Sequence, residues 1–415
     1  MNNRHNINCA GGFRKARSGG SRGAVMIVTL WIVLGIAAMV LLFARSVTVE
    51  LFASANQVAA LQADAVAKGA LQYVLAQLDG ADALPDPAAV PFEAVSIGNN
   101  NGAGNPAGYF WILQPPGDNE TGYRFGLVDE ASKLNINGCG NATAATFVDM
   151  LMNLPNMTND IAASIVNWRS PPTSGVSGGA ESDYYLSLAN PYNCKNSPFE
   201  TVEELLLVEG VTPQLLYGDD ANRNGVLDPN EFDSTLGVSG SSVAAGTAVD
   251  GGWNNDVTVY SRGPSGAGTG SRASSSQNGL INVNTAQTAV LLCLPGLDQS
   301  DVAALINYRN TSGADLSSIA WVSRAISQTK AAQVMSLITV RSYQYAADIV
   351  AVSGDGRAYR RYRAIVDAGV SPPAVLYWKD LTYLGWPLDP TILTKLRSGT
   401  GLTSATTVVA QGNSQ

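Results

Sequence analysis

Residues 220–231 carry the pattern in this sequence that is best suited to binding an ion. They read DANRNGVLDPNE and match the EF-hand calcium loop at positions 1, 3, 5, 6, 9 and 12. Calcium takes six to eight oxygen ligands, and this spacing wraps oxygen atoms around one point. The expected ligands are the side chains of Asp220, Asn222, Asn224, Asp228 and Glu231 and the backbone carbonyl of Val226. We expect calcium here rather than a solvated turn, and no second recognisable loop lies beside it to form a paired sensor.

The position of the single histidine argues against most enzymatic chemistry. His5 stands in a basic segment at the N-terminus, so the body of the chain has no imidazole for a catalytic triad or a zinc site. Hydrolysis by a pair of carboxylates remains open, but no pair is marked out by its spacing. We expect a protein without enzymatic activity.

The four cysteines occur in different settings. Cys9 lies in the N-terminal segment, and Cys293 lies in an apolar run, LLCL, where a buried and inert thiol is expected. Cys139 and Cys194 lie in loops rich in asparagine and glycine. Outside the cytoplasm these two could form a disulfide or remain separate thiols.

An apolar segment, residues 24–44, follows the basic N-terminus. It reads AVMIVTLWIVLGIAAMVLLFA, and a helix of this length crosses a hydrocarbon core of about 30 Å. Residues 1–23 hold five basic residues and no acidic one, whereas the rest of the chain holds 20 basic and 33 acidic residues. This asymmetry predicts a cytoplasmic N-terminus and an acidic body outside the cytoplasm. A secretory signal is the competing interpretation, but its apolar region would be shorter, about 7–15 residues.

The helix is expected to continue beyond the apolar segment, as far as Leu78. From Ser46 to Leu78 the sequence has no proline and one glycine, and apolar residues recur every three or four positions. The expected apolar stripe consists of Val58, Leu61, Ala65, Leu71, Val74, Leu75 and Leu78. This half of the helix should pack on a folded domain.

The N-terminal segment resembles a prepilin-type signal, because a short basic leader ends in Gly23 and the apolar start of a long helix follows at once. The resemblance implies cleavage by a prepilin peptidase between Gly23 and Ala24, with methylation of the new N-terminus. Most pilins and pseudopilins carry glutamate at the fifth mature position, where this sequence has Val28. That departure is typical of the K-type minor pseudopilins of type II secretion systems. Such a subunit cannot make the usual contact between this carboxylate and the N-terminal amine of a neighbour.

Two pairs of strand-like segments, far apart in the chain, indicate one antiparallel sheet. Residues 108–114 and 123–129 flank a turn-rich linker, and residues 342–352 and 357–367 flank SGDG. The resemblance implies a pseudopilin α+β fold, in which the long helix packs on this sheet, with a large all-α insertion of the helix-hairpin-helix or SAM-like type. The expected parts are a leader (1–23), a transmembrane helix (24–44), its amphipathic continuation (45–78), a pseudopilin domain (79–129 and 338–390), a helical insertion with the calcium loop (130–337) and a flexible tail (391–415).

The insertion contains near-repeats. LNIN (134–137) and INVN (281–284) each precede a short helical run, a turn and a second helix that ends in arginine, and residues 203–211 form a third partial copy. In DNA-binding helix-hairpin-helix units the turn reads glycine–apolar–glycine, but here Asn156 and Asp298 each replace one glycine. A carboxylate at that turn and an acidic body both repel phosphate. We therefore expect no nucleic-acid binding, and a membrane-tethered DNA receptor is the alternative.

The resemblance to K-type minor pseudopilins extends from the leader to about Leu388. It implies a single-pass protein of the bacterial inner membrane, with its body in the periplasm at the tip of a pseudopilus. Such a subunit would start or cap the filament together with minor pseudopilins of types I and J and other type II secretion components. The broad insertion would make it too wide to be followed by further subunits in a close-packed shaft.

Overall fold

The computed structural model describes most of the chain. It covers residues 22–80, 85, 89–98, 106–115, 124–233, 237–239, 251–263, 279–402 and 407–408. The chain divides into two compact units, Met1–Val58 and Ala59–Gln415. The leader before Arg22, with His5 and Cys9, lies outside the described residues.

The described part of the first unit is the N-terminal portion of helix α1 (Arg22–Leu78). The helix is continuous, so the predicted extension to Leu78 is confirmed. Among the described residues it is the one helix that is long and apolar enough to cross a membrane, with a mean hydropathy of 2.8 in its most apolar window. Two of its hydroxyl groups bond within the helix, because Thr29 donates to the carbonyl of Met26 at 3.0 Å and Thr48 to that of Ala44 at 2.8 Å.

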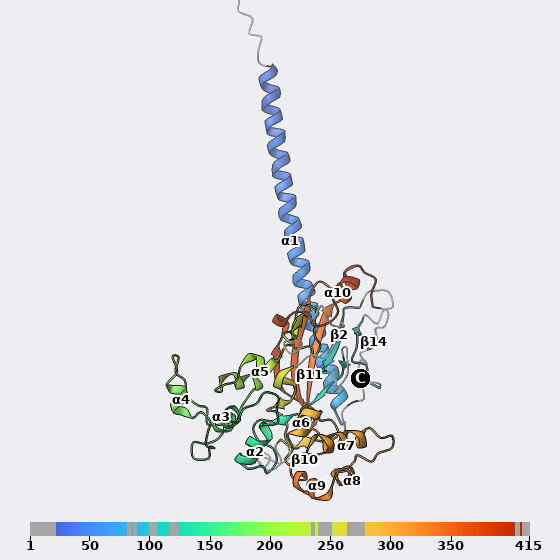
Figure 1. Ribbon diagram of the computed structural model, residues 1–415. Helices are drawn as coiled ribbons and strands as arrows, with labels where there is room; N and C mark the ends of the chain where they lie inside the picture. The colour runs from blue at the N-terminus through green and yellow to red at the C-terminus, as the bar shows by residue number, and fades with distance from the viewer. Residues whose placement is uncertain are drawn as a thin grey trace, which may run out of the picture. The chain divides into compact units, whose positions relative to one another are not determined.

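The second unit is built around one sheet with the strand order β13-β12-β11-β2-β1-β14 (Figure 1). Its strands are β1 (Val95–Ile97), β2 (Gly108–Gln114), β3 (Arg124–Phe125), β4 (Val128–Asp129), β11 (Gln344–Ser353), β12 (Tyr359–Asp367), β13 (Ala374–Asp380) and β14 (Thr407–Val408). The predicted hairpins are present as the antiparallel pairs β2–β3 and β11–β12, but the predicted strand 123–129 is divided into β3 and β4, and β4 pairs with β11 instead. They join into one sheet because β11 also pairs with β2, and the pairing is antiparallel throughout except between β1 and β14.

One face of this sheet is covered by the C-terminal part of α1, residues 59–78. The core on this face contains Val66, Ala67, Ala70, Val74 and Leu78 of the helix and Phe110, Ile112, Ile349, Ala351 and Val366 of the sheet. The helix and the sheet lie close together at Gly108, where an added Cβ would lie 2.6 Å from Cγ2 of Val66. Any larger residue at this position would separate the two layers.

The buried stripe of α1 differs from the predicted one at its N-terminal end. Val58, Leu61 and Ala65 are exposed, whereas Ala59 and Ala63 are buried. The difference arises because small side chains allow close approach in a packed interior, so alanine rather than leucine defines the buried face here. From Val66 onward the helix buries one apolar face, as predicted.

The opposite face of the sheet is covered in part by the segment that follows β13. Tyr109, Trp111, Val350 and Val352 of the sheet pack against Leu388 and Leu396. Leu396 belongs to α10 (Pro390–Arg397), whose first turn is capped by the side chain of Asp389. The structure therefore differs from the predicted flexible tail, since residues 390–397 form a helix with a buried side chain.

The insertion between β4 and β11 has an apolar core of its own, which includes Phe147, Tyr185, Trp253 and Trp321. Its helices are α2 (Ala144–Leu151), α3 (Asn159–Arg169), α4 (Ser182–Leu186), α5 (Pro213–Tyr217), α6 (Thr288–Leu292), α7 (Gln299–Arg309), α8 (Val322–Ala325) and α9 (Gln328–Val334). The 3-10 helices are η1 (Glu130–Ser132), η2 (Val202–Leu207), η4 (Gly252–Asn255) and η6 (Ile319–Trp321), and η7 (Thr382–Leu384) follows β13. Helices α6 to α9, in orange, lie together in Figure 1.

The prediction that the insertion is all-α is wrong. β5 (Leu134–Asn135) pairs in parallel with β8 (Val257–Thr258), and β9 (Ile281–Asn282) pairs in parallel with β10 (Ile338–Thr339). A third, antiparallel pair joins β6 (Phe232–Asp233) to β7 (Val238–Ser239). Each of these strands has two residues, which is too short for an alternating pattern to be visible in the sequence.

The two fuller near-repeats of the insertion share their internal contacts. The last asparagine of each repeat motif, Asn137 or Asn284, donates to a distant backbone carbonyl at 2.9 or 3.1 Å. The arginine that ends the second helix of each copy also returns to this motif, because Arg169 donates to the carbonyl of Asn137 and Arg309 to that of Val283. The predicted near-repeats are therefore copies in structure as well as in sequence.

Candidate metal site in the 220–231 loop

The 220–231 loop lies between α5 and β6 and folds around its own carboxylates. Asp220 accepts hydrogen bonds from the backbone amides of Asn224 at 3.0 Å and Gly225 at 2.7 Å. Glu231 closes the loop from the other end, because it accepts from the amides of Asn222 at 3.2 Å and Asp228 at 2.9 Å. The turn at Gly225 has a φ of 84°, a conformation that favours glycine and was expected at this position of a calcium loop.

The five residues predicted to bind through their side chains form one hydrogen-bonded network, in which backbone amides of the loop also take part. Nδ2 of Asn222 and Nδ2 of Asn224 both donate to Oδ2 of Asp228, the latter at 3.0 Å. Oδ1 of Asn222 is buried and has no hydrogen-bond partner. An amide in this setting can rotate by 180°, which would turn its oxygen toward the carboxylates and its nitrogen away from them.

The carboxylates of the loop are largely removed from solvent. Asp220 is 3% exposed and Glu231 is 5% exposed. Burial raises the pKa of Asp220, and it also raises the pKa of Glu231, to which the charge of Asp220 contributes. A divalent cation among these oxygens would offset both effects, since it favours the ionised carboxylates.

These residues fit calcium rather than a softer metal. The available donors are carboxylate and amide oxygens and the backbone carbonyl of Val226, and hard oxygen donors are what calcium prefers. Among the described residues, no group of three or more His, Cys, Asp and Glu side chains is placed to hold a metal ion, so the site depends on the amide and carbonyl oxygens as well. Leu227 is 1% exposed and anchors the loop in the protein interior.

The loop is fastened to the sheet by Arg361, a residue that sequence reasoning missed. This side chain is 0% exposed, and its guanidinium donates to the backbone carbonyls of Asn222 and Arg223. The same guanidinium forms a bidentate ion pair with Asp348, with Nε to Oδ1 at 2.9 Å and Nη2 to Oδ2 at 2.7 Å. A sequence signal for this residue was available in YRRYR, residues 359–363 of β12. Arg361 and Arg363 stand two positions apart, so they should face the same side of the strand, toward the protein interior.

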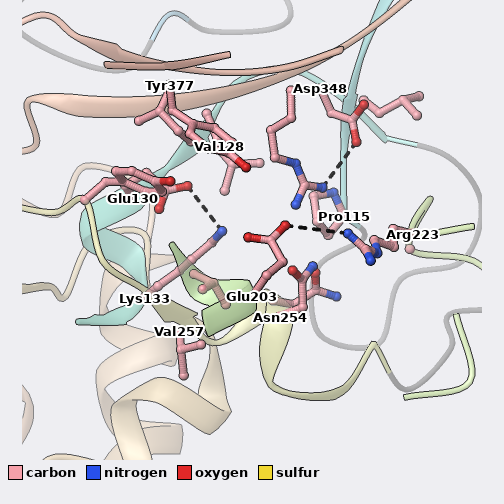
Figure 2. Close-up of a pocket in the computed structure, with 18 of the residues that line it drawn as sticks. Pro115, Val128, Glu130, Lys133, Glu203, Arg223, Asn254, Val257, Asp348 and Tyr377 are labelled. Atoms are coloured by element: carbon pink, nitrogen blue, oxygen red, sulfur yellow. Dashed lines mark hydrogen bonds and ion pairs between the residues drawn. The ribbon is translucent and has the colours of Figure 1, made fainter. Parts of the chain in front are cut away.

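Asp348 and the neighbouring ion pairs line a small charged cavity between the sheet and the insertion (Figure 2). The cavity has a volume of about 60 Å³. Lys133 pairs with Glu130 at 3.2 Å, Arg223 lies 3.8 Å from Glu203, and Arg363 pairs with Asp348 at 3.2 Å. Positive and negative side chains thus balance across the cavity, which suits a structural interface.

The pKa of Asp348 shows that the paired charges outweigh burial. Burial acts to raise this pKa, but Arg361 and then Arg363 lower it, and the net shift is downward. The pKa of Glu203 is lowered in the same way, since Lys379, at 2.6 Å, and Arg223 more than offset burial. Both carboxylates therefore stay ionised at neutral pH, which is the state that holds the sheet and the insertion together.

The other predicted site residues lie in other parts of the chain. Gly23 and Ala24 lie in the exposed first turns of α1, while the leader before them lies outside the described residues. Cys139 and Cys194 are separate buried thiols, so the disulfide considered from the sequence is not formed. Their sulfur atoms approach different backbone carbonyls, those of Leu337 and Asn167, and burial raises the pKa of Cys139 to about 12.

Removal of the Asp348 carboxylate should strongly destabilise the protein. In Asp348→Ala, two arginines lose a buried counter-charge, and breaking a buried ion pair in this way costs about 3–5 kcal/mol. Thermal unfolding of the detergent-solubilised chain measures the effect. The matched control is Glu200→Ala, which removes an exposed carboxylate that lies 3.6 Å from Lys195 and should cost less than about 1 kcal/mol. Equal losses in the two variants would contradict the role of Asp348.

The comparisons with known proteins identify the family. Residues 132–217 match the family model for the first domain of protein K of the type II secretion system. The chain is also similar in structure to a chain of the GspK-GspI-GspJ complex from the type 2 secretion system of enterotoxigenic Escherichia coli. That likeness has 12% sequence identity and a TM-score of 0.47, and it covers 80% of this chain and 99% of the other. No curated protein matches the chain. The match agrees with the resemblance seen in the sequence: residues 132–217 form a domain of the protein K family of type II secretion systems.

Proposed function

We propose that this minor pseudopilin stands at the tip of the periplasmic pseudopilus and starts or caps its assembly. The observation that carries the proposal is Val28, an apolar residue at the fifth position after the Gly23–Ala24 junction of α1. A subunit without a carboxylate there has no partner to offer to the N-terminal amine of a neighbour. It can therefore end a row of subunits, which is the position of a tip protein.

The insertion supports the same position. It has its own apolar core and occupies residues 130–337 between two strands of the sheet, so it adds a second folded mass to the pseudopilin domain. A mass of this size suits the end of a filament, where no further subunit has to pack above it. The partners would be minor pseudopilins of types I and J, the two components named with GspK in the similar complex.

The membrane topology follows from the charge asymmetry of the chain. The basic leader would remain on the cytoplasmic side until a prepilin peptidase removes it, and the acidic body would lie in the periplasm. The apolar part of α1 would hold the protein in the inner membrane before it enters the filament. We assign no enzymatic activity to the body, because its charged groups in the described part of the chain mainly form structural pairs.

The alternative of a membrane-tethered DNA receptor finds little support in the turns of the near-repeats. Asp298 caps α7, and Lys330 lies 2.8 Å from its carboxylate, so this turn presents a negatively charged group that is already engaged. The acidic body also repels a polyanion over a longer range. The near-repeats are better suited to building a wide head.

We further propose that the 220–231 loop holds a calcium ion through Asp220, Asn222, Asn224, Val226, Asp228 and Glu231. The unpartnered Oδ1 of Asn222 and the buried carboxylates support this assignment. The ion would stiffen the junction between the insertion and the sheet, and it has no role in catalysis.

Mass analysis of the N-terminus tests the processing that this function requires. The membrane-extracted protein should begin at Ala24, with its amine methylated, because a prepilin peptidase cuts after Gly23. A mature N-terminus near Asn56 would instead indicate ordinary secretion and would contradict the pseudopilin assignment of α1.

The position in the filament can be tested by labelling. In cells that assemble the pseudopilus, gold attached to an epitope placed after Gln415 should mark one end of each filament. The reason is that a subunit with Val28 ends the row of contacts. The matched variant Val28→Glu restores the carboxylate and should allow labels to appear along the shaft if head size permits. Labels distributed along the filaments of the unaltered protein would contradict a tip position.

Calcium removal should destabilise the body. Chelation with EDTA is expected to lower the melting temperature of the solubilised protein, and calcium should restore it, because a ligand at 100 times its Kd stabilises the folded state by about 2.7 kcal/mol. Glu231→Gln removes one ligand charge, so its melting temperature should respond little to either treatment. A calcium response of equal size in this variant would place the ion elsewhere.

A further inference from the structure

We infer that Arg361 is a positioning residue for the metal site, so that calcium binding and docking of the 220–231 loop on the sheet stabilise each other. This inference rests on the calcium site proposed above. Arg361 belongs to β12 and lies 139 positions from Asn222 in the sequence. Its hydrogen bonds to the loop go to backbone carbonyls that are not proposed ligand atoms.

The guanidinium of Arg361 holds the loop at two consecutive backbone carbonyls. Arg361 donates to the carbonyls of Asn222 and Arg223, the residues at positions 3 and 4 of the calcium loop. These carbonyls are held against β12, and the side-chain amide of Asn222 lies on Asp228 within the loop. Fixing this carbonyl therefore restricts where the amide oxygen of Asn222 can be placed.

Arg223, one of these two residues, has an unfavourable backbone conformation. Its φ is 57°, in the left-handed region that is unfavourable for a residue with a Cβ. Arg361 holds the carbonyl of this residue, and the guanidinium of Arg223 lies 3.8 Å from the ring centre of Tyr217. These contacts compensate for the strained backbone that separates the two asparagine ligands.

A second connection acts on the next ligand along the loop. Nδ2 of Asn224 donates to the carbonyl of Pro387 at 2.9 Å, and Oδ1 of the same side chain accepts from the amide of Val226 at 2.9 Å. Pro387 adjoins Leu388, which is buried in the core under α10. The structured segment after the sheet therefore orients the Asn224 amide, as β12 orients that of Asn222.

These contacts make the coupling reciprocal. An ion that requires the present placement of Asn222 and Asn224 favours the conformation in which their anchors on the sheet are also formed. By thermodynamic linkage, any factor by which Arg361 strengthens calcium binding is the factor by which calcium strengthens docking. If Arg361 served only to neutralise Asp348, its replacement would lower stability but leave calcium affinity unchanged.

The test compares calcium affinity in Arg361→Lys and Arg360→Lys by isothermal titration of the full, solubilised chain. Lysine keeps the positive charge beside Asp348 but cannot donate to both carbonyls while keeping the bidentate pair. We expect its calcium Kd to rise about tenfold. Arg360 is the adjacent residue of β12 and donates to its own neighbour, Tyr359, so its replacement should change the Kd less than about twofold.

Hydrogen exchange of the unaltered protein provides a second measurement that does not depend on an arginine variant folding. Calcium should slow exchange in residues 359–363 and 382–388, where the amide of Arg361 is held by Thr382 at 3.1 Å. Glu231→Gln should abolish this protection. Equal calcium affinity in both lysine variants, or protection confined to residues 220–231, would overturn the inference and leave the calcium site intact. No calcium binding by the unaltered chain would instead reject the metal site itself and, with it, the coupling.

Discussion

Arg361 carries a permanent positive charge into a position without solvent exposure, where the loss of hydration has to be offset on every side. Asp348 supplies the counter-charge, and two loop carbonyls accept hydrogen bonds from Nη1 and Nη2. These partners come from the sheet and from the insertion, so the guanidinium is satisfied only when the two are docked in one geometry. A buried pair of this kind adds little net stability, but it penalises every other arrangement.

The rest of the junction between sheet and insertion is also polar. The apolar residues of the body fall into three separate clusters, one in the insertion and one on each face of the sheet. Polar contacts join the insertion to the sheet. One example is Asp129, a buried residue of β4 that accepts hydrogen bonds from Asn282 at 2.9 Å and from Thr285, both in the second near-repeat. Apolar burial holds each part together, whereas hydrogen bonds and ion pairs determine how the parts meet.

This division explains which features could be predicted from the sequence. The long helix, both hairpins and the spacing of the 220–231 loop are local patterns, and the structure contains them. The exposed Leu61 and the two-residue strands were not predictable, because packing of small side chains and isolated pairs leave no periodicity. Arg361 could be placed on an inward face of β12, but its partners are distant in sequence, and only the folded chain brings them together.

The turns of the near-repeats show why these units can serve packing rather than phosphate binding. Asn156, Gly210 and Gly296 have positive φ values of 56°, 77° and 77°, so asparagine takes the glycine position in the first copy. Two residues later, each turn ends in an N-cap whose side chain accepts a backbone amide of the next helix; these caps are Thr158, Thr212 and Asp298. A phosphate at these turns would have to compete with the caps for the same donors. At the third turn the cap is the carboxylate of Asp298, which would also repel a phosphate.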